Sequence, residues 1–121
     1  MIDRASVKVW IAAYEQAWRT AGVSLLTTLF TEDAAYRMSP YEEPVRGLAE
    51  IGALWERERT GPDEGFEMSW ELVAVEDDTA VTRMEVAYAS GAAYRDLWII
   101  RFAADGRCRE FTEWFIERPD A

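Results

Sequence analysis

The chain has 121 residues, half of them hydrophobic, which is enough apolar material for one domain, residues 1–121, with its own core. Its 23 acidic and 13 basic residues give a formal net charge of −10, which disfavours nucleic acid and anionic membranes as partners. It has no histidine, which excludes Ser-His-Asp and Cys-His catalysis and leaves acid–base chemistry to carboxylates, Tyr, Arg or a cofactor.

The first thirty residues predict two helices. Four residues recur at helical spacing and mark the buried side of a helix over residues 3–20: Val7, Ile11, Tyr14 and Trp18. Ser24 is placed to cap a short second helix over residues 25–30, because its side-chain oxygen can accept from a free backbone N–H group.

The middle of the chain predicts a short strand and a third helix. Residues 34–38 form the strand candidate, and the helix is expected over residues 48–59, with Arg59 on its solvent side. The segment 60–65, Thr-Gly-Pro-Asp-Glu-Gly, breaks this helix. Alternation of apolar and polar side chains then predicts two strands, residues 66–75 and 79–89.

Residues 93–117 predict a long β-hairpin. The turn Ala104-Asp105-Gly106 joins two β-rich runs, and Asp-Gly between such runs is a strong hairpin signal. Alternation separates each strand into two sets. The first strand has Tyr94, Asp96, Trp98, Ile100 and Phe102 on one face and Arg95, Leu97, Ile99 and Arg101 on the other. The second strand has Phe111, Glu113 and Phe115 on one face and Glu110, Thr112, Trp114 and Ile116 on the other. Both faces carry large apolar groups, so both are expected to be covered.

The order of elements predicts an α+β fold. Helices are expected on one face of a strongly curved, mainly antiparallel sheet, with a cavity left at its open end. Two stretches, 29–34 (Leu-Phe-Thr-Glu-Asp-Ala) and 44–47 (Pro-Val-Arg-Gly), together with Tyr14, resemble the NTF2-like superfamily, in particular its SnoaL-like and ketosteroid-isomerase-like members. The closing pattern around 100–107 is similar to theirs. The resemblance implies a cone-shaped fold with three N-terminal helices and a conical pocket.

The resemblance does not supply a reaction. Ketosteroid isomerases use an Asp base and an oxyanion hole of Tyr and protonated Asp. Tyr14 matches the position of that tyrosine, but the base position falls near Met38 and Ser39, and the second aspartate falls at Trp98. The Arg-x-Asp arrangement of epoxide hydrolases would also need a carboxylate near Trp98. Steroid isomerisation by that set of residues is therefore not expected.

Asp96, Glu113 and Tyr14 are the candidate catalytic residues. Two carboxylates in an aromatic cavity would have raised, coupled pKa values, so one could act as acid and the other as base, with Tyr14 as hydrogen-bond donor. The alternative is that each carboxylate pairs with an arginine, such as Arg37 or Arg46, or lies in water at a strand end. Tyr14 could equally be an ordinary core residue.

The pocket wall is expected to be aromatic and apolar. Its predicted residues are Trp18, Met38, Trp55, Trp70, Trp98, Phe111 and Phe115. The expected ligand is a small hydrophobic or aromatic molecule. No metal site and no cofactor is predicted, because no metal-binding spacing is present.

The other face of the hairpin predicts a homodimer. Leu97, Ile99, Trp114 and Ile116 would form a large apolar patch, which usually marks an interface. The single cysteine, Cys108, and the absence of a signal-peptide pattern in the first ten residues favour the cytoplasm.

Three functions stay open at this point. The first is a small-molecule binding domain. The second is an enzyme on the same pocket, a cyclase, isomerase or dehydratase that uses Asp96 or Glu113. The third is a dimeric interaction module whose cavity is filled by its own tryptophans.

Overall fold

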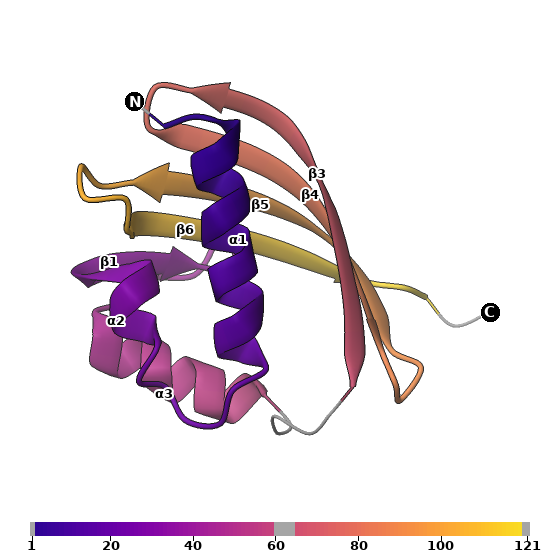
Figure 1. Ribbon diagram of the computed structural model, residues 1–121. Coiled ribbons are helices and arrows are strands. Elements are labelled where there is room, and N and C mark those ends of the chain that lie inside the picture. Colours follow the sequence, from indigo (N-terminus) through magenta and orange to yellow (C-terminus); the bar gives the residue numbers. More distant parts are fainter. Residues whose placement is uncertain (1, 60–64, 120–121) are drawn as a thin grey trace.

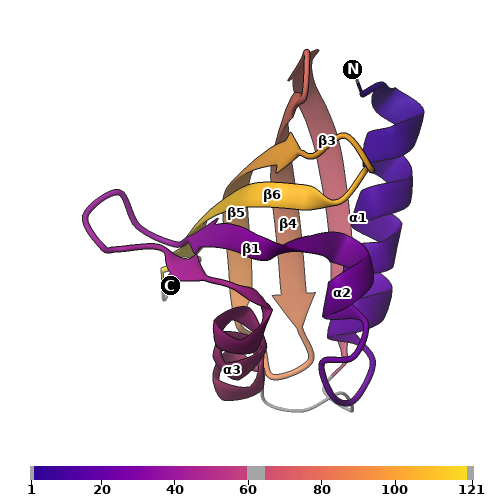
Figure 2. The ribbon, with the colours of Figure 1, turned by 90° about the vertical axis from the view of Figure 1, so that its left-hand side faces the viewer.

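A computed structural model of the chain describes residues 2–59 and 65–119, and in it one six-stranded sheet curves around α1 (Figures 1 and 2). The helices are α1 (Arg4–Trp18), α2 (Leu26–Leu29) and α3 (Leu48–Glu58). The strands are β1 (Phe30–Arg37), β2 (Val45–Arg46), β3 (Phe66–Glu76), β4 (Thr79–Tyr88), β5 (Ala93–Phe102) and β6 (Cys108–Glu117). The predicted α+β class is confirmed, although α2 has only four residues and α3 follows β1 and β2.

The strand order is β2-β1-β6-β5-β4-β3. Every pair is antiparallel except β1 with β6, which run parallel. The parallel pair joins a strand from the first third of the chain to the last strand. It sets Tyr36 of β1 directly beside Phe111 of β6, so Tyr36 faces the same side of the sheet as the apolar set of the hairpin.

The predicted hairpin and its two faces are confirmed. Gly106 has φ +90°, the left-handed conformation that the turn requires. Trp98 lies opposite Glu113, and Asp96 lies opposite Phe115, so the two carboxylates are diagonal neighbours on one face. That face looks into the curve of the sheet, where α1 lies (Figure 1).

The buried side of α1 fills the inside of the curve. Val7, Trp10, Ile11 and Tyr14 are buried there. Asp3 caps the helix through a 2.8 Å hydrogen bond from the Ser6 backbone N–H. The predicted Ser24 cap of α2 is wrong, because the helix begins one residue later, at an N-cap Leu25 with no side-chain hydrogen bond.

Arg59 is buried, contrary to the predicted solvent position. Its side chain is 5% exposed, because it turns from the end of α3 towards the C-terminal end of α1. Carbonyl groups of Ala17, Trp18, Thr20 and Gly22 accept hydrogen bonds of 2.8–3.3 Å from its guanidinium. The cation thus satisfies carbonyls that a helix end leaves free. The predicted break over residues 60–65 lies outside the described residues, apart from Gly65.

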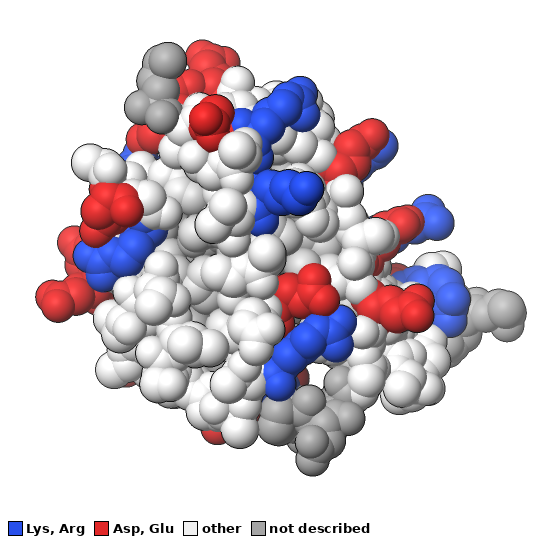
Figure 3. Space-filling view, viewed as in Figure 1, with Lys and Arg blue, Asp and Glu red and all other residues white. Residues whose placement is uncertain are grey.

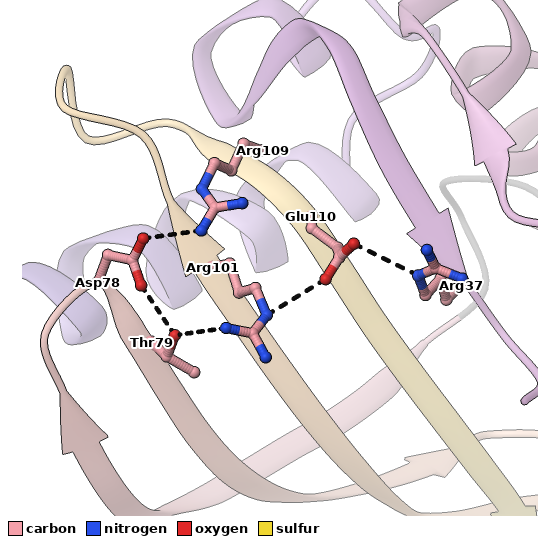
Figure 4. Close-up of polar contacts among 6 residues, drawn as sticks. All are labelled: Arg37, Asp78, Thr79, Arg101, Arg109 and Glu110. Carbon is pink, nitrogen blue, oxygen red and sulfur yellow. Dashed lines mark hydrogen bonds and ion pairs between the residues drawn. The ribbon is translucent and has the colours of Figure 1, made fainter.

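The outer face of the sheet, away from the helices, carries ion pairs. A connected set runs across four strand ends and the turn before β4: Arg37, Glu110, Arg101, Thr79, Asp78 and Arg109 (Figure 4). Acidic and basic side chains also stand beside one another where β3 and β4 run, on the right of Figure 3. Within the described residues, no helix is both long and apolar enough to cross a membrane.

Candidate functional site

A pocket of about 300 Å³ opens between the concave sheet, α1 and the end of α3. Seven aromatic side chains line it: Tyr14, Trp18, Phe66, Tyr88, Tyr94, Trp98 and Phe115. Three carboxylates also line it: Glu58, Asp96 and Glu113. The remaining wall is Met38, Arg59, Met68, Val86, Ser90 and Ala92. A cavity of this size and composition is typical of sites for small, largely apolar ligands.

All three predicted catalytic residues line this pocket, and they come from three elements. Tyr14 comes from α1, Asp96 from β5 and Glu113 from β6. The diagonal pairing of β5 with β6 brings the two carboxylates together, and the buried side of α1 brings Tyr14 to them. Strand alternation and helical spacing therefore explain why these three side chains face the pocket.

A hydrogen-bonded chain joins Tyr14 to Glu113 through a third residue, Tyr36. The Tyr36 hydroxyl donates to Glu113 Oε1 at 3.0 Å, and the Tyr14 and Tyr36 hydroxyl oxygens are 3.2 Å apart. Because the Tyr36 hydroxyl donates its hydrogen to Glu113, its oxygen accepts a hydrogen bond from the Tyr14 hydroxyl. Burial, followed by the charge of Glu113, raises the pKa of both tyrosines well above its usual value, so both stay protonated donors.

Sequence reasoning missed Tyr36. It lies two residues before Met38, and the alternation that turns Met38 inwards turns Tyr36 inwards as well. The signal was therefore present in the predicted strand, but the parallel pairing with β6 that brings Tyr36 to Glu113 was not.

The two carboxyl groups have pKa values near neutral. Burial, reinforced by the Asp96 charge, raises the pKa of Glu113 to about 7, although the hydrogen bond from Tyr36 opposes the rise. Burial raises the pKa of Asp96 to about 6, and polar interactions with the Trp98 side chain and the Ile116 backbone oppose it only in part. Near pH 7 Asp96 is therefore mostly ionised, and Glu113 is the group that retains a proton.

No arginine or lysine neutralises the pair. Among residues 2–59 and 65–119, no ion pair reaches Asp96 or Glu113, and Asp96 Oδ1 accepts no hydrogen bond. Arg37, which the sequence offered as a partner, pairs instead with Glu110 on the outer face. The one basic side chain on the pocket wall, Arg59, is committed to backbone carbonyls and to Glu56 at 2.6 Å. The acidic pair thus faces the pocket uncompensated.

Four of the seven predicted wall residues line the pocket: Trp18, Met38, Trp98 and Phe115. The structure does not place the other three there. Trp55 and Phe111 are fully buried behind Tyr14, with ring centroids 5.1 and 5.6 Å from its ring. Trp70 packs against the core farther along β3, opposite Met84 of β4. The interior tryptophans thus back the pocket rather than fill it.

No group of three or more Cys, Asp or Glu side chains within the described residues is arranged to hold a metal ion. Cys108 is buried, and burial raises the pKa of its thiol to about 12, so it is not a thiolate at neutral pH. The titratable groups that the pocket offers are the carboxyls of Glu58, Asp96 and Glu113, with tyrosine hydroxyls beside them.

Comparisons with solved structures agree on the fold. An NTF2-like protein of unknown function from Burkholderia xenovorans LB400 is 20% identical, with a TM-score of 0.74, over 97% of this chain and 88% of that one. A protein of unknown function with a cystatin-like fold from Methylobium petroleophilum PM1 is 18% identical, with a TM-score of 0.73, over 99% of this chain and 81% of that one. A SnoaL-like protein of unknown function from Burkholderia thailandensis E264 is 19% identical, with a TM-score of 0.72, over 96% of this chain and 99% of that one.

Among curated proteins, no relative matches. The family model of the SnoaL-like domain matches residues 11–111, which include the second half of α1, the whole of β5 and the start of β6. This match spans most of the chain and agrees with the NTF2-like and SnoaL-like solved structures. The chain therefore belongs to the SnoaL-like domain family, with the NTF2-like fold.

Proposed function

We propose that this protein binds a small, largely apolar molecule in the pocket between α1 and the concave sheet. The supporting observation is the cavity of about 300 Å³, whose wall combines seven aromatic rings with a few polar groups. An interaction module with a filled interior would need no such space. We propose that the protein works in the cytoplasm, because its single cysteine, Cys108, is a buried free thiol.

A second candidate function is acid–base catalysis on the bound molecule. It is favoured by Asp96 and Glu113, two carboxyls on one pocket wall that no basic side chain neutralises. Near pH 7, Asp96, with the lower pKa, is the ionised base, and Glu113 is the group that holds a proton. Tyr14 and Tyr36 would transmit that proton's position to the pocket through their hydroxyl groups. The reaction class is the proton transfer of an isomerase, cyclase or dehydratase.

Tryptophan fluorescence tests the binding proposal. Trp18 and Trp98 line the pocket, so a bound apolar molecule should shift or quench their emission. We expect saturable changes with several members of a panel of apolar and aromatic molecules. If Trp18→Phe reduces the signal change while calorimetry shows that the molecule still binds, the site is the pocket. No saturable change with any member would contradict the proposal.

A further inference from the structure

We propose that the preferred ligand is an organic cation, a small amine with an aromatic or apolar body, whose ammonium group pairs with Asp96. This inference rests on the proposed function, because it names the class of molecule that the same pocket takes. It follows from the charges on the pocket wall and from the hydrogen bonds that the wall leaves unmade.

The first observation is an unsatisfied buried carboxyl group. Asp96 is only 9% exposed, lines the pocket, and has one oxygen, Oδ1, that accepts no hydrogen bond among the described residues. Polar interactions with the Trp98 side chain and the Ile116 backbone favour its ionised form only in part. A buried carboxylate oxygen without a donor is unfavourable, so such an atom is normally found paired. A ligand that brings a charged N–H donor would supply the missing partner.

The second observation is the sign of the charge around Asp96. Glu113 and Glu58 line the same pocket, and among the described residues the only basic one on the wall, Arg59, is bound to Glu56 and to backbone carbonyls. An anionic ligand would therefore enter a negative field with no free cation to receive it. The net charge of −10 adds a long-range attraction for cations.

The third observation is the aromatic wall. Tyr14, Trp18 and Trp98 lie beside the carboxyls, and aromatic rings attract cations as well as apolar groups. Trp18 already lies 5.8 Å from the Arg59 guanidinium, a cation–aromatic contact at the pocket wall. A metal ion is the poorer occupant, because no group of three ligands is arranged for one within the described residues. The wall fits a cation with an apolar body.

Calorimetry with three ligands of nearly equal size tests the inference: 4-phenylbutylamine, 4-phenylbutanol and 4-phenylbutanoate. They share one apolar body and differ in charge. At pH 7.5 we expect the amine to bind roughly tenfold or more tighter than the alcohol, and the carboxylate to bind weakest. Asp96→Asn should bring the amine close to the alcohol and leave the alcohol within about twofold. Asp33→Asn, an exposed aspartate on β1, is the control and should change neither affinity.

Proton release gives a second readout that packing alone would not produce. A bound cation favours the ionised carboxyls, so amine binding at pH 6.5 should release protons, measured in buffers of different ionisation enthalpy. Alcohol binding should release none. Among residues 2–59 and 65–119, the titratable and charged groups that face the pair from the surrounding elements are Tyr14, Tyr36, Glu58, Arg59, Tyr88 and Tyr94.

The outcomes separate this inference from the proposed function. If the alcohol or the carboxylate binds as tightly as the amine, or if Asp96→Asn keeps the preference for the amine, the cation inference is overturned and pocket binding stands. If none of the three binds but an uncharged member of the fluorescence panel does, the cation inference is again overturned. If no molecule in either experiment binds, the proposed function fails with it.

Discussion

Tyr36 and Glu113 lie on neighbouring parallel strands, and the Tyr36 hydroxyl donates a 3.0 Å hydrogen bond to Glu113 Oε1. The bond ties β1 to β6 inside the curve of the sheet. It also connects the carboxyl to Tyr14 on α1, so the position of one proton is felt on three elements.

Removing the Tyr36 hydroxyl should change the titration of Glu113. This hydrogen bond favours the ionised form of Glu113, so Tyr36→Phe should raise the pKa of Glu113 above about 7. Carboxyl ¹³C NMR measures this pKa. The free energy of unfolding should fall by about 1 kcal/mol. Tyr41→Phe, at an exposed tyrosine, is the control and should change neither quantity. An unchanged or lower Glu113 pKa in Tyr36→Phe would remove Tyr36 from the network.

The acidic pair should make the protein less stable as pH rises from about 4 to 7. In this window the unfolded chain loses both protons near its ordinary pKa values of 3.8 and 4.5, whereas the folded protein keeps them up to about 6 and 7. The folded state thus binds more protons, and the stabilisation is present at low pH and lost as pH rises through the folded pKa values. Urea unfolding should show a loss of about 2–4 kcal/mol between pH 4.5 and 8, allowing for the partial exposure of Glu113.

The net charge of −10 acts in the same direction, so a variant isolates the pair. Asp96→Asn with Glu113→Gln should flatten the pH dependence by most of that amount. Asp33→Asn with Glu71→Gln changes two exposed carboxylates and should leave the slope nearly as it was. Equal slopes in both double variants would show that the pair titrates normally.

Arg59 should be important for stability, despite its place at the end of α3. Arg59→Met removes the donor for four carbonyls near the end of α1, and we expect a loss of about 2–4 kcal/mol in urea unfolding. Arg59→Lys should recover only part of it, because an ammonium cannot reach several carbonyls at once. Arg57→Met, at an exposed residue on the same helix, should cost less than about 0.5 kcal/mol. Similar losses for Arg57 and Arg59 would contradict this account.

The outer sheet face is proposed to bind a second copy of this chain. Trp114 and Ile116 are 40% and 70% exposed there, beside the partly buried Leu97 and Ile99. The same face also carries ion-paired arginines and carboxylates, part of them in Figure 4, and side chains of both charges can pair with themselves across a two-fold axis. Sedimentation should give a dimer for the parent protein and a monomer for Trp114→Glu. Val9→Glu, at an exposed apolar residue on α1, should stay dimeric, and a monomeric parent would end the proposal.

Local patterns predicted the hairpin and its faces well, because two runs rich in aromatic and β-branched residues flank an Asp-Gly turn and alternation assigns their side chains to two faces. Strand alternation, however, gives the side of the sheet and not the position along the strand. Phe111 and Phe115 share a face, yet Phe111 lies in the core and Phe115 at the pocket. That difference depends on where α1 and α3 cover the sheet, which no local pattern states.

Two further misses have the same origin in long-range contacts. Tyr36 reaches Glu113 only because β1 pairs with β6, 77 residues away in the chain. Arg59 lies at the end of an amphipathic helix, where a charged residue is expected to face solvent. Its side chain is buried instead, because it donates hydrogen bonds to carbonyls near the end of α1. In both, the polar partner that fixes the side chain comes from a distant element.

Carboxyl ¹³C NMR titration of Asp96 and Glu113 in the free protein, between pH 3 and 9, tests the account most directly. Asp96, which is buried, and Glu113, which is half-buried, should titrate at about 6 and about 7, because no basic side chain among the described residues pairs with them. Midpoints for both groups at the ordinary values of 3.8 and 4.5 would mean that water or a cation already satisfies them, and would contradict the site described above.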